Sequence, residues 1–298
     1  MLRFAFLVVL SLTAIASGED CFAPFLTDTP PKIVEILETK TEQGVEVTDL
    51  RFLSRVVPET GREVLIFATL ARPVGGADDA KRAGIVACHG GGGYCVRMRS
   101  RVIGWAKRGY VAIAQDQPGF VNRGKAKSTG PCMEKGASGF KIIDKPQDSS
   151  LFDGVAAVLN SLALLRSQPD VDKERVGVWG GSWGGYMTTM VAGVAGDRVK
   201  AAYSVYGCGF YDSGTMWRAR LEKMPEAQRR IWLENLDAGR RASGLTATYF
   251  VPGPANDWFF WPSGVMRTLE QMPGDKNYCF HPNDSHGFGL PGGTGDRR

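Results

Sequence analysis

The sequence predicts an α/β fold, in which a mostly parallel sheet of about eight strands carries helices on both faces. Three observations lead to this prediction. Short, nearly continuous apolar runs recur along the chain, as strands buried on both sides require. Stretches with helical spacing of their apolar residues separate these runs. The 298 residues are 43% hydrophobic, which is enough for a large core.

The first predicted element is a hairpin, formed by VEVTDLRFLS and EVLIFATLARP around the turn-like PETGR. Apolar side chains at helical spacing predict a helix over residues 150–168, and a second helix is expected from Met187 to Val194. The alternation of strands and helices is typical of a parallel sheet. Apolar runs predict its strands at residues 84–90, 110–117, 175–182, 200–207, 246–257 and 276–283.

A longer insert, of about residues 208–244, separates two of the predicted strands. It contains WRARLEK and EAQRRIWLENLDAGRRA, which are strongly helix-forming. We expect it to form a small helical cap over one end of the sheet. Because the chain has no repeats, low-complexity tracts or linker-like shifts of composition, residues 19–298 predict a single domain.

Residues 1–18 have the pattern of a secretory signal peptide. Arg3 gives a positive flank, residues 4–15 are apolar, and the small residues Ala16 and Gly18 offer a cleavage site. The apolar stretch is too short to span a bilayer comfortably, so we expect a secreted or periplasmic protein with no stable membrane insertion after cleavage. The formal net charge of +5 is scattered, and no basic stripe predicts nucleic-acid binding.

Six cysteines follow this segment, and an exported chain lies where disulfides persist. We expect one or two bridges, although the sequence cannot choose the pairing. No Cys-x-x-Cys pair is present, and we expect neither a metal nor an organic cofactor. The cysteines are Cys21, Cys88, Cys95, Cys132, Cys208 and Cys279.

Residues 180–184 read GGSWG and match the G-x-S-x-G motif. The motif follows a predicted strand and precedes a predicted helix, which is the context in which a serine is exposed on a sharp turn. Gly180, Gly184 and Gly185 would let the neighbouring backbone approach without side-chain clashes. We therefore predict Ser182 as a catalytic nucleophile; the alternative is a structural turn.

A serine nucleophile needs a base, and the chain has three histidines. His286 lies in a polar loop after the last predicted strand, where the base belongs if the chain order is nucleophile, acid, base. It is the predicted base. His281 lies within that strand and is expected to be a core residue, and His89 begins a glycine run.

The acid must then lie between the serine and the histidine. Asp257 ends a predicted strand there and is the predicted acid, which would fix the imidazole tautomer; the alternative is an Asx-turn residue. Asp284 is the second candidate, although its closeness to His286 suits a local hydrogen bond better. Asp237 lies on a predicted cap helix and is expected to face solvent.

The run HGGGGY at 89–94 follows the strand predicted at 84–90. Runs of glycine let backbone N–H groups converge on a developing negative charge, so the run predicts an oxyanion hole. A phosphate-binding loop would need a Lys-Ser/Thr pair that this run lacks. Tyr94 could donate its hydroxyl to the oxyanion or serve in packing. The predicted backbone donors are Gly90, Gly91, Gly92 and Trp183.

The chain resembles the exported acetyl xylan esterase and dienelactone hydrolase-like group of the α/β-hydrolase superfamily, and is similar to the catalytic domain of prolyl-oligopeptidase-type peptidases. The resemblance covers roughly residues 60–290. It implies Ser182, Asp257 and His286 as the triad. The motifs that carry it are HGGGGY at 89–94, DKERVGVWGGSWGGYMTT at 172–189, GPANDWFFWP at 253–262 and DSHGF at 284–288.

The resemblance implies an ester hydrolase that acts through an acyl-enzyme, with a carbohydrate O-acyl ester as the preferred substrate class. Serine stands where dienelactone hydrolases carry cysteine, and no segment before residue 60 could form the propeller of the oligopeptidases. Trp258 and Trp217 could stack on a sugar or an aromatic acyl group, or join the cap to the sheet. Arg97, Arg99 and Arg101 could bind a carboxylate or be exposed.

Two alternatives stay open at this point. One is a prolyl-oligopeptidase-like serine peptidase. The other is a non-catalytic binding protein on a hydrolase fold, because a fold does not guarantee a function. The presence of all three residues Ser182, Asp257 and His286 argues against the second alternative. The sequence does not predict an oligomeric state.

Overall fold

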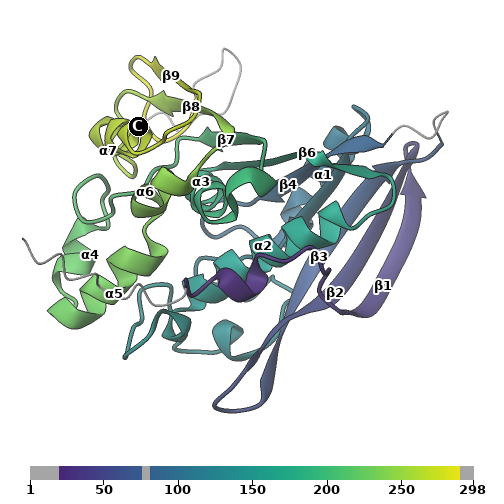
Figure 1. The fold of residues 1–298 in the computed structure, drawn as a ribbon, viewed down its shortest axis with the longest axis horizontal. Coiled ribbons are helices and arrows are strands. Elements are labelled where there is room, and N and C mark those ends of the chain that lie inside the picture. The colour runs from purple at the N-terminus through teal and green to yellow at the C-terminus, as the bar shows by residue number, and fades with distance from the viewer. Residues whose placement is uncertain (1–19, 76–80, 289–298) are drawn as a thin grey trace, which may run out of the picture.

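The computed structural model describes residues 20–75 and 81–288. These form one nine-stranded sheet with the order β1-β2-β3-β5-β4-β6-β7-β8-β9 (Figure 1). The first three strands are antiparallel, β3 pairs antiparallel with β5, and all pairs from β5 to β9 are parallel. The signal peptide predicted at residues 1–18 lies outside the described residues.

The predicted hairpin and the six predicted strands are all present. The hairpin is β2 with β3, and the apolar runs are β4 to β9. The strands are β1 (Ile33–Glu42), β2 (Val45–Val57), β3 (Arg62–Pro73), β4 (Arg82–Cys88), β5 (Val111–Gln115), β6 (Val171–Gly181), β7 (Ala201–Val205), β8 (Thr248–Pro254) and β9 (Lys276–His281).

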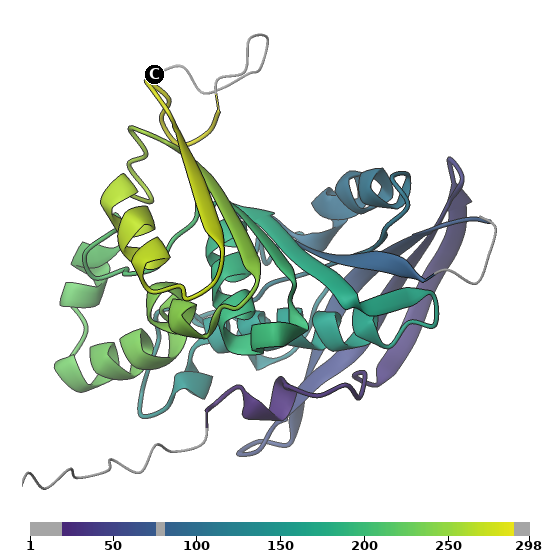
Figure 2. The same ribbon diagram turned by 45° about the horizontal axis from the view of Figure 1, so that its top comes forward.

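The strand that the sequence did not predict is β1. Its side chains are exposed or half-exposed along its whole length, so it shows none of the apolar alternation that marks a half-buried strand. It lies at the outer edge of the sheet, and Figure 2 shows the sheet twisting from this purple edge to the yellow β9 at the other.

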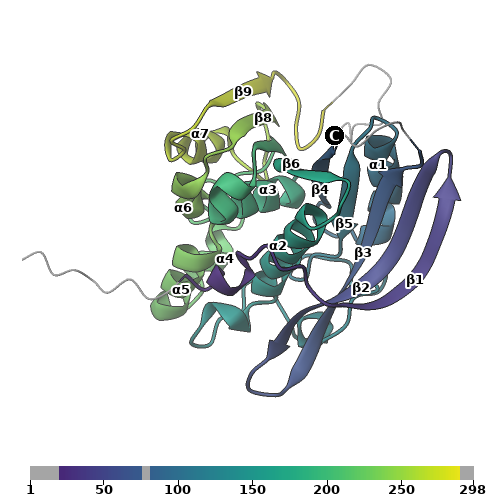
Figure 3. The same cartoon turned by 45° about the vertical axis from the view of Figure 1, so that its right-hand side comes forward.

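The helices predicted near residues 150–168 and 187–194 are α2 and α3. Figures 1 and 3 place the helices of the insert, α4 to α6, away from the β1–β2 hairpin. That the insert acts as a cap stays a prediction. The helices are α1 (Cys95–Ala106), α2 (Ser150–Arg166), α3 (Trp183–Ala195), α4 (Arg218–Glu222), α5 (Glu226–Leu236), α6 (Ala238–Arg241) and α7 (Pro262–Glu270).

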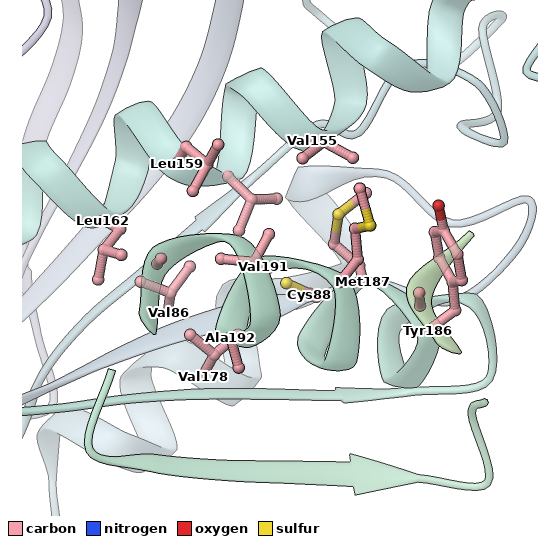
Figure 4. Packing of buried hydrophobic residues seen from close by; sticks show 14 of the residues in the cluster. Val86, Cys88, Val155, Leu159, Leu162, Val178, Tyr186, Met187, Val191 and Ala192 are labelled. Carbon is pink, nitrogen blue, oxygen red and sulfur yellow. The ribbon is translucent and has the colours of Figure 1, made fainter. Parts of the chain in front are cut away.

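Apolar side chains fill both faces of the sheet. In β4, Val86 and Cys88 belong to one core cluster and Ala87 belongs to another, because successive side chains of a strand point to opposite faces. Figure 4 shows Val86 and Cys88 against side chains of α2 and α3, including Leu159 and Val191. The other cluster contains the buried residues of α1. The sheet is therefore covered on both faces, as predicted.

The expectation of one or two disulfides is wrong for this structure, because all six cysteines are free. Four are buried at positions where they act as small apolar side chains, such as Cys88 in β4 and Cys95 at the start of α1. Burial raises the pKa of the Cys88 and Cys95 thiols, which keeps them protonated and unreactive. No helix in the described part of the chain is long and apolar enough to cross a membrane.

Candidate active site

Ser182 lies on a sharp turn between β6 and α3, in the strand–turn–helix context that the motif requires. Its backbone has φ 59° and ψ −121°, which a residue other than glycine rarely adopts. Two backbone hydrogen bonds hold it there: its N–H donates to the Val205 carbonyl at 2.8 Å, and its carbonyl accepts from the Tyr186 N–H at 3.0 Å. The turn lies at the carboxyl end of β6 and leaves Ser182 half-buried.

The glycines around Ser182 are required by close backbone contacts. A Cβ on Gly180 would lie 2.5 Å from the Gly184 carbonyl oxygen and 2.7 Å from that of Cys88. A Cβ on Gly184 would overlap the Cys88 carbonyl, and one on Gly185 would lie 2.8 Å from the Val205 carbonyl oxygen. The turn therefore packs backbone to backbone against the ends of β4 and β7, where no larger residue fits.

Ser182, His286 and Asp257 form a continuous chain of hydrogen bonds. His286 Nε2 lies 2.8 Å from Ser182 Oγ, and its Nδ1 lies 3.0 and 2.9 Å from the two carboxylate oxygens of Asp257. Because an ionised carboxylate only accepts, Nδ1 carries the proton and Nε2 is left to accept from the serine hydroxyl. This is the arrangement of a nucleophile, a general base and an orienting acid.

The acid and the base come together because β8 and β9 are parallel neighbours. Asp257 follows the end of β8 and His286 follows the end of β9, so both loops leave the same edge of the sheet. The Asn256 N–H donates to the Asp284 carbonyl at 3.1 Å and joins the two loops. The imidazole of His286 is thus bonded to Asp257, and the second candidate, Asp284, contributes its backbone to the connection.

Asp257 is held from a second side. Its Oδ1 accepts from the N–H groups of Phe259 at 2.8 Å and Phe260 at 3.1 Å, and the residue is only 4% exposed. The Asx-turn that the sequence left as an alternative is therefore present together with the bond to His286. Backbone donors stabilise the ionised carboxylate, which fixes the imidazole in turn.

Two other predictions for titratable residues are wrong. Asp237 does not face solvent: it is fully buried, caps α6, and accepts from the N–H groups of Phe210 and Tyr211 at 2.9 and 2.8 Å. His281 is not a core residue, since it is half-buried and its ring packs against Phe288 at 4.6 Å. An Asp directly before a helix is a capping signal, and this signal could have indicated the role of Asp237.

The glycine run lies beside the serine. A Cβ on Gly90 would lie 3.7 Å from Ser182 Cβ, and one on Gly91 would lie 2.6 Å from Cδ1 of the Trp183 indole. The backbone N–H groups of Gly91 and Trp183 donate to no acceptor among the described residues. They are therefore free to bind a developing oxyanion.

Gly92 does not fit the role predicted for it. Its N–H donates to the Phe120 carbonyl at 2.8 Å, and the next N–H, of Gly93, donates to the Gly90 carbonyl at 3.0 Å. With φ +68°, Gly92 serves the loop as the residue that turns the chain. The candidate oxyanion donors are thereby reduced to the first two glycines of the run and Trp183.

His89 is a site residue whose role the sequence did not indicate. Its buried ring lies 2.8 Å from the Gly90 carbonyl through Nδ1 and accepts from the Gln117 N–H at 3.1 Å through Nε2, so the neutral tautomer with Nδ1–H satisfies both bonds. Burial lowers its pKa, although the nearby Asp116 carboxylate acts in the opposite direction. His89 thus ties the glycine loop to the end of β5.

The predicted substrate residues lie in different surroundings. Trp258 is 55% exposed, and its ring lies 3.7 Å from that of Phe259, which in turn lies 4.4 Å from His286. Trp217 is half-buried and lies 4.8 Å from Trp183. Tyr94 is half-buried and precedes α1.

The three arginines after the glycine loop also differ. Arg99 forms ion pairs with Glu42 and Asp49, and these pairs join α1 to β1 and β2. Arg97 and Arg101 are exposed. The structure therefore does not gather the three guanidinium groups into one carboxylate-binding site.

Comparisons with known proteins agree with this architecture. The prolyl oligopeptidase family matches residues 152–231, which include Ser182. No curated protein matches the chain. An acetyl xylan esterase from Paenibacillus sp. is 18% identical with a TM-score of 0.70, and acetyl xylan esterase 1 from Thermoanaerobacterium sp. is 19% identical with a TM-score of 0.69. In both cases 90% of this chain aligns with 87% of the other.

A third structure is a putative dienelactone hydrolase from Klebsiella pneumoniae, which is 18% identical with a TM-score of 0.53 over 82% of this chain and 88% of the other. At these identities the similarity shows the fold. The chain has the α/β-hydrolase fold, and its assignment to that superfamily is supported by the family match and the solved structures together.

Proposed function

We propose that this α/β-hydrolase-fold protein is a serine hydrolase that cleaves carboxylic esters through an acyl-enzyme. The observation that carries the proposal is the chain of hydrogen bonds from Ser182 through His286 to Asp257, with the serine on a strained turn. Strain of this kind persists where the surrounding structure enforces it, and it is concentrated at functional sites.

In the proposed reaction, Ser182 Oγ attacks the ester carbonyl while His286 Nε2 takes its proton. The oxyanion that forms accepts hydrogen bonds from the N–H groups of Trp183 and of the first two glycines of the run, Gly90 and Gly91. Loss of one such donor costs about 2.7–4 kcal/mol in other oxyanion holes. The protonated His286, held by Asp257, then gives its proton to the leaving alcohol. Water enters with His286 again as base, and it releases the acid.

The proposed substrate is an acylated carbohydrate or a similar small ester. Two acetyl xylan esterases share the fold, and the exposed ring of Trp258, which lies against Phe259 next to the base, is one on which a sugar could stack. We also propose that the protein is secreted or periplasmic, because residues 1–18 have the signal-peptide pattern.

A serine peptidase is the second candidate, because the prolyl oligopeptidase family matches the segment around the serine. The two candidates share the triad and differ in the bond they cleave. The ratio of kcat/KM for aryl esters to that for aminoacyl-4-nitroanilides separates them. A higher value for the anilides would replace the esterase proposal with the peptidase.

The direct test is hydrolysis of 4-nitrophenyl acetate by the wild type and by Ser182→Ala. We expect the variant to lose roughly 10⁴-fold or more of kcat. Ser100→Ala, at an exposed position on α1, is the matched control and should keep full activity. Equal activity of Ser182→Ala and wild type would remove Ser182 from the mechanism. A wild type inactive on esters and anilides would instead favour a binding protein.

A further inference from the structure

The nine-stranded sheet has two edges, β1 and β9, and they differ in how well they are protected. Among the described strands, β1 pairs with β2 alone and β9 with β8 alone. Two register shifts interrupt the pairing of β1 with β2. Irregular pairing and charged side chains are the devices that keep an edge from pairing with another chain. The charged residues of β1 are Glu35, Glu38, Lys40 and Glu42.

The β9 edge lacks these devices over most of its length. It pairs with β8 without a register shift, and it carries no charge from Asn277 to Phe280. The side chains from Lys276 to Cys279 are all exposed. Tyr278 is 48% exposed despite its large ring, and the Cys279 thiol is exposed and free.

We propose that the β9 edge binds the β9 edge of a second copy of this chain, antiparallel and with the twofold axis at Cys279. The two sheets would then continue into one another. In this register Tyr278 lies opposite Phe280 of the second copy, Asn277 lies opposite His281, and the two Cys279 residues face each other. Five of the six residues of β9 take part.

The sequence of β9 is self-complementary in this register. Directly opposite residues of an antiparallel pair lie on the same face of the sheet. Tyr278 and Phe280 already share a face and lie 5.6 Å apart, so the two copies bring four aromatic rings together there. Aromatic pairs across strands stabilise such contacts. Centring the axis on Tyr278 instead would place the Lys276 ammonium group opposite Phe280.

The charges of the two edges also favour β9. The strand residues of two β1 edges include three glutamates and one lysine from each copy, and like charges across strands destabilise pairing. Glu35 and Glu42 already form ion pairs with Arg51 and Arg99 of their own chain. At β9 the one charged strand residue, Lys276, falls beyond the paired segment, opposite Pro282 of the second copy. The proposal does not depend on the catalytic activity, since it follows from the edge strand alone.

The first experiment measures the mass of the full chain in solution by light scattering. We expect a dimer for the wild type and a monomer for Tyr278→Lys, which places a charge in the middle of the edge. Circular dichroism shows whether the variant is folded. Phe250→Ser, on the sheet face of the neighbouring strand β8, is the control and should stay dimeric. A monomeric wild type, or a folded Tyr278→Lys that stays dimeric, overturns the proposal.

The second experiment tests the register with the native thiol. Diamide takes two electrons and two protons from a pair of thiols that form a disulfide, which requires Cα atoms about 4.4–6.8 Å apart. Cys279 of each copy meets this condition at the axis, so we expect rapid cross-linking that Cys279→Ser abolishes without loss of the dimer. If the Cys279→Ser, Asn277→Cys double variant cross-links instead, the register is wrong, because the proposed axis separates those thiols by roughly 13 Å.

Discussion

The two ends of the proposed triad are held in place by different forces. Ser182 is fixed by its own backbone, which turns through a strained conformation and packs on β4 and β7 where even a Cβ would overlap. His286 is fixed by side-chain contacts: hydrogen bonds to both carboxylate oxygens of Asp257 and to Ser182, and the neighbouring rings of Phe259 and Tyr206. Its loop follows the exposed edge strand β9.

This difference indicates at which end of the triad a substitution can remove activity without changing stability. At the nucleophile, any change that moves the backbone also disturbs the core between β4 and α3, so activity and folding are lost together. At the base, a substitution can remove the reactive geometry while the fold stays intact. The predictions below test this contrast from the largest expected effect to the smallest.

The largest effect is expected for Asp257→Asn. The amide oxygen can still accept from Phe259 and Phe260, so the loop should keep its shape. The amide cannot orient His286 with a proton on Nδ1 as the carboxylate does, and kcat for ester hydrolysis should fall by roughly 10⁴-fold. Unfolding by urea should be almost unchanged. If Asp284→Asn costs as much activity, the acid has been assigned to the wrong residue.

At the nucleophile end, Gly184→Ala should destabilise the protein by about 1–3 kcal/mol or more, because its Cβ would overlap the Cys88 carbonyl. Gly104→Ala in α1 is the matched control, since its Cβ would meet only the flexible Arg108 side chain at 3.6 Å. The control should be stabilised by about 0.5–1 kcal/mol. Urea unfolding measures both, and equal effects would contradict the close packing of the turn.

The sequence was sufficient for features that depend on neighbours in the chain. The turn at Ser182 is recognisable because a strand, a glycine motif and a helix follow one another directly. Some features set by distant contacts were missed. The burial of Asp237 depends on the N–H groups of Phe210 and Tyr211, which lie far away in the sequence, and the loss of Gly92 as a donor depends on the Phe120 carbonyl. A capping signal could have placed Asp237 at the start of α6, but no local pattern records its bonds to Phe210 and Tyr211 or the bond of Gly92 to Phe120.

A smaller effect concerns the pH dependence of stability and involves His89. Burial lowers its pKa in the folded protein below the value of about 6.5 expected when unfolded. Its contribution is therefore fully present above pH 6.5 and is lost as the pH falls, because the unfolded chain then binds a proton that the folded chain excludes. The free energy of unfolding should therefore fall as the pH drops below 6.5, by at most about 1.4 kcal/mol per pH unit.

The matched variant for this effect is His89→Asn, whose amide can still donate to the Gly90 carbonyl but does not titrate. Subtracting its pH profile from that of the wild type removes the contributions of all other groups, which both proteins share. The difference should be flat above pH 6.5 and slope below it. A difference that is flat throughout would mean that His89 binds its proton equally well in both states.

The smallest effect is expected at the exposed ring of Trp258, which reaches the base only through Phe259. Trp258→Ala removes a side chain that lies on Phe259 and has little contact with the core, so stability should hardly change. If the ring stacks on a sugar, KM for an acetylated oligosaccharide should rise by about 3- to 10-fold, in keeping with about 0.5–1.5 kcal/mol for such a contact. Hydrolysis of 4-nitrophenyl acetate, which has no sugar, should be unchanged.

Tyr203→Ala removes another exposed ring, on β7, and should affect neither substrate. Equal losses on both substrates would show that Trp258 positions His286 through Phe259, and the base end would then depend on packing as the nucleophile end does.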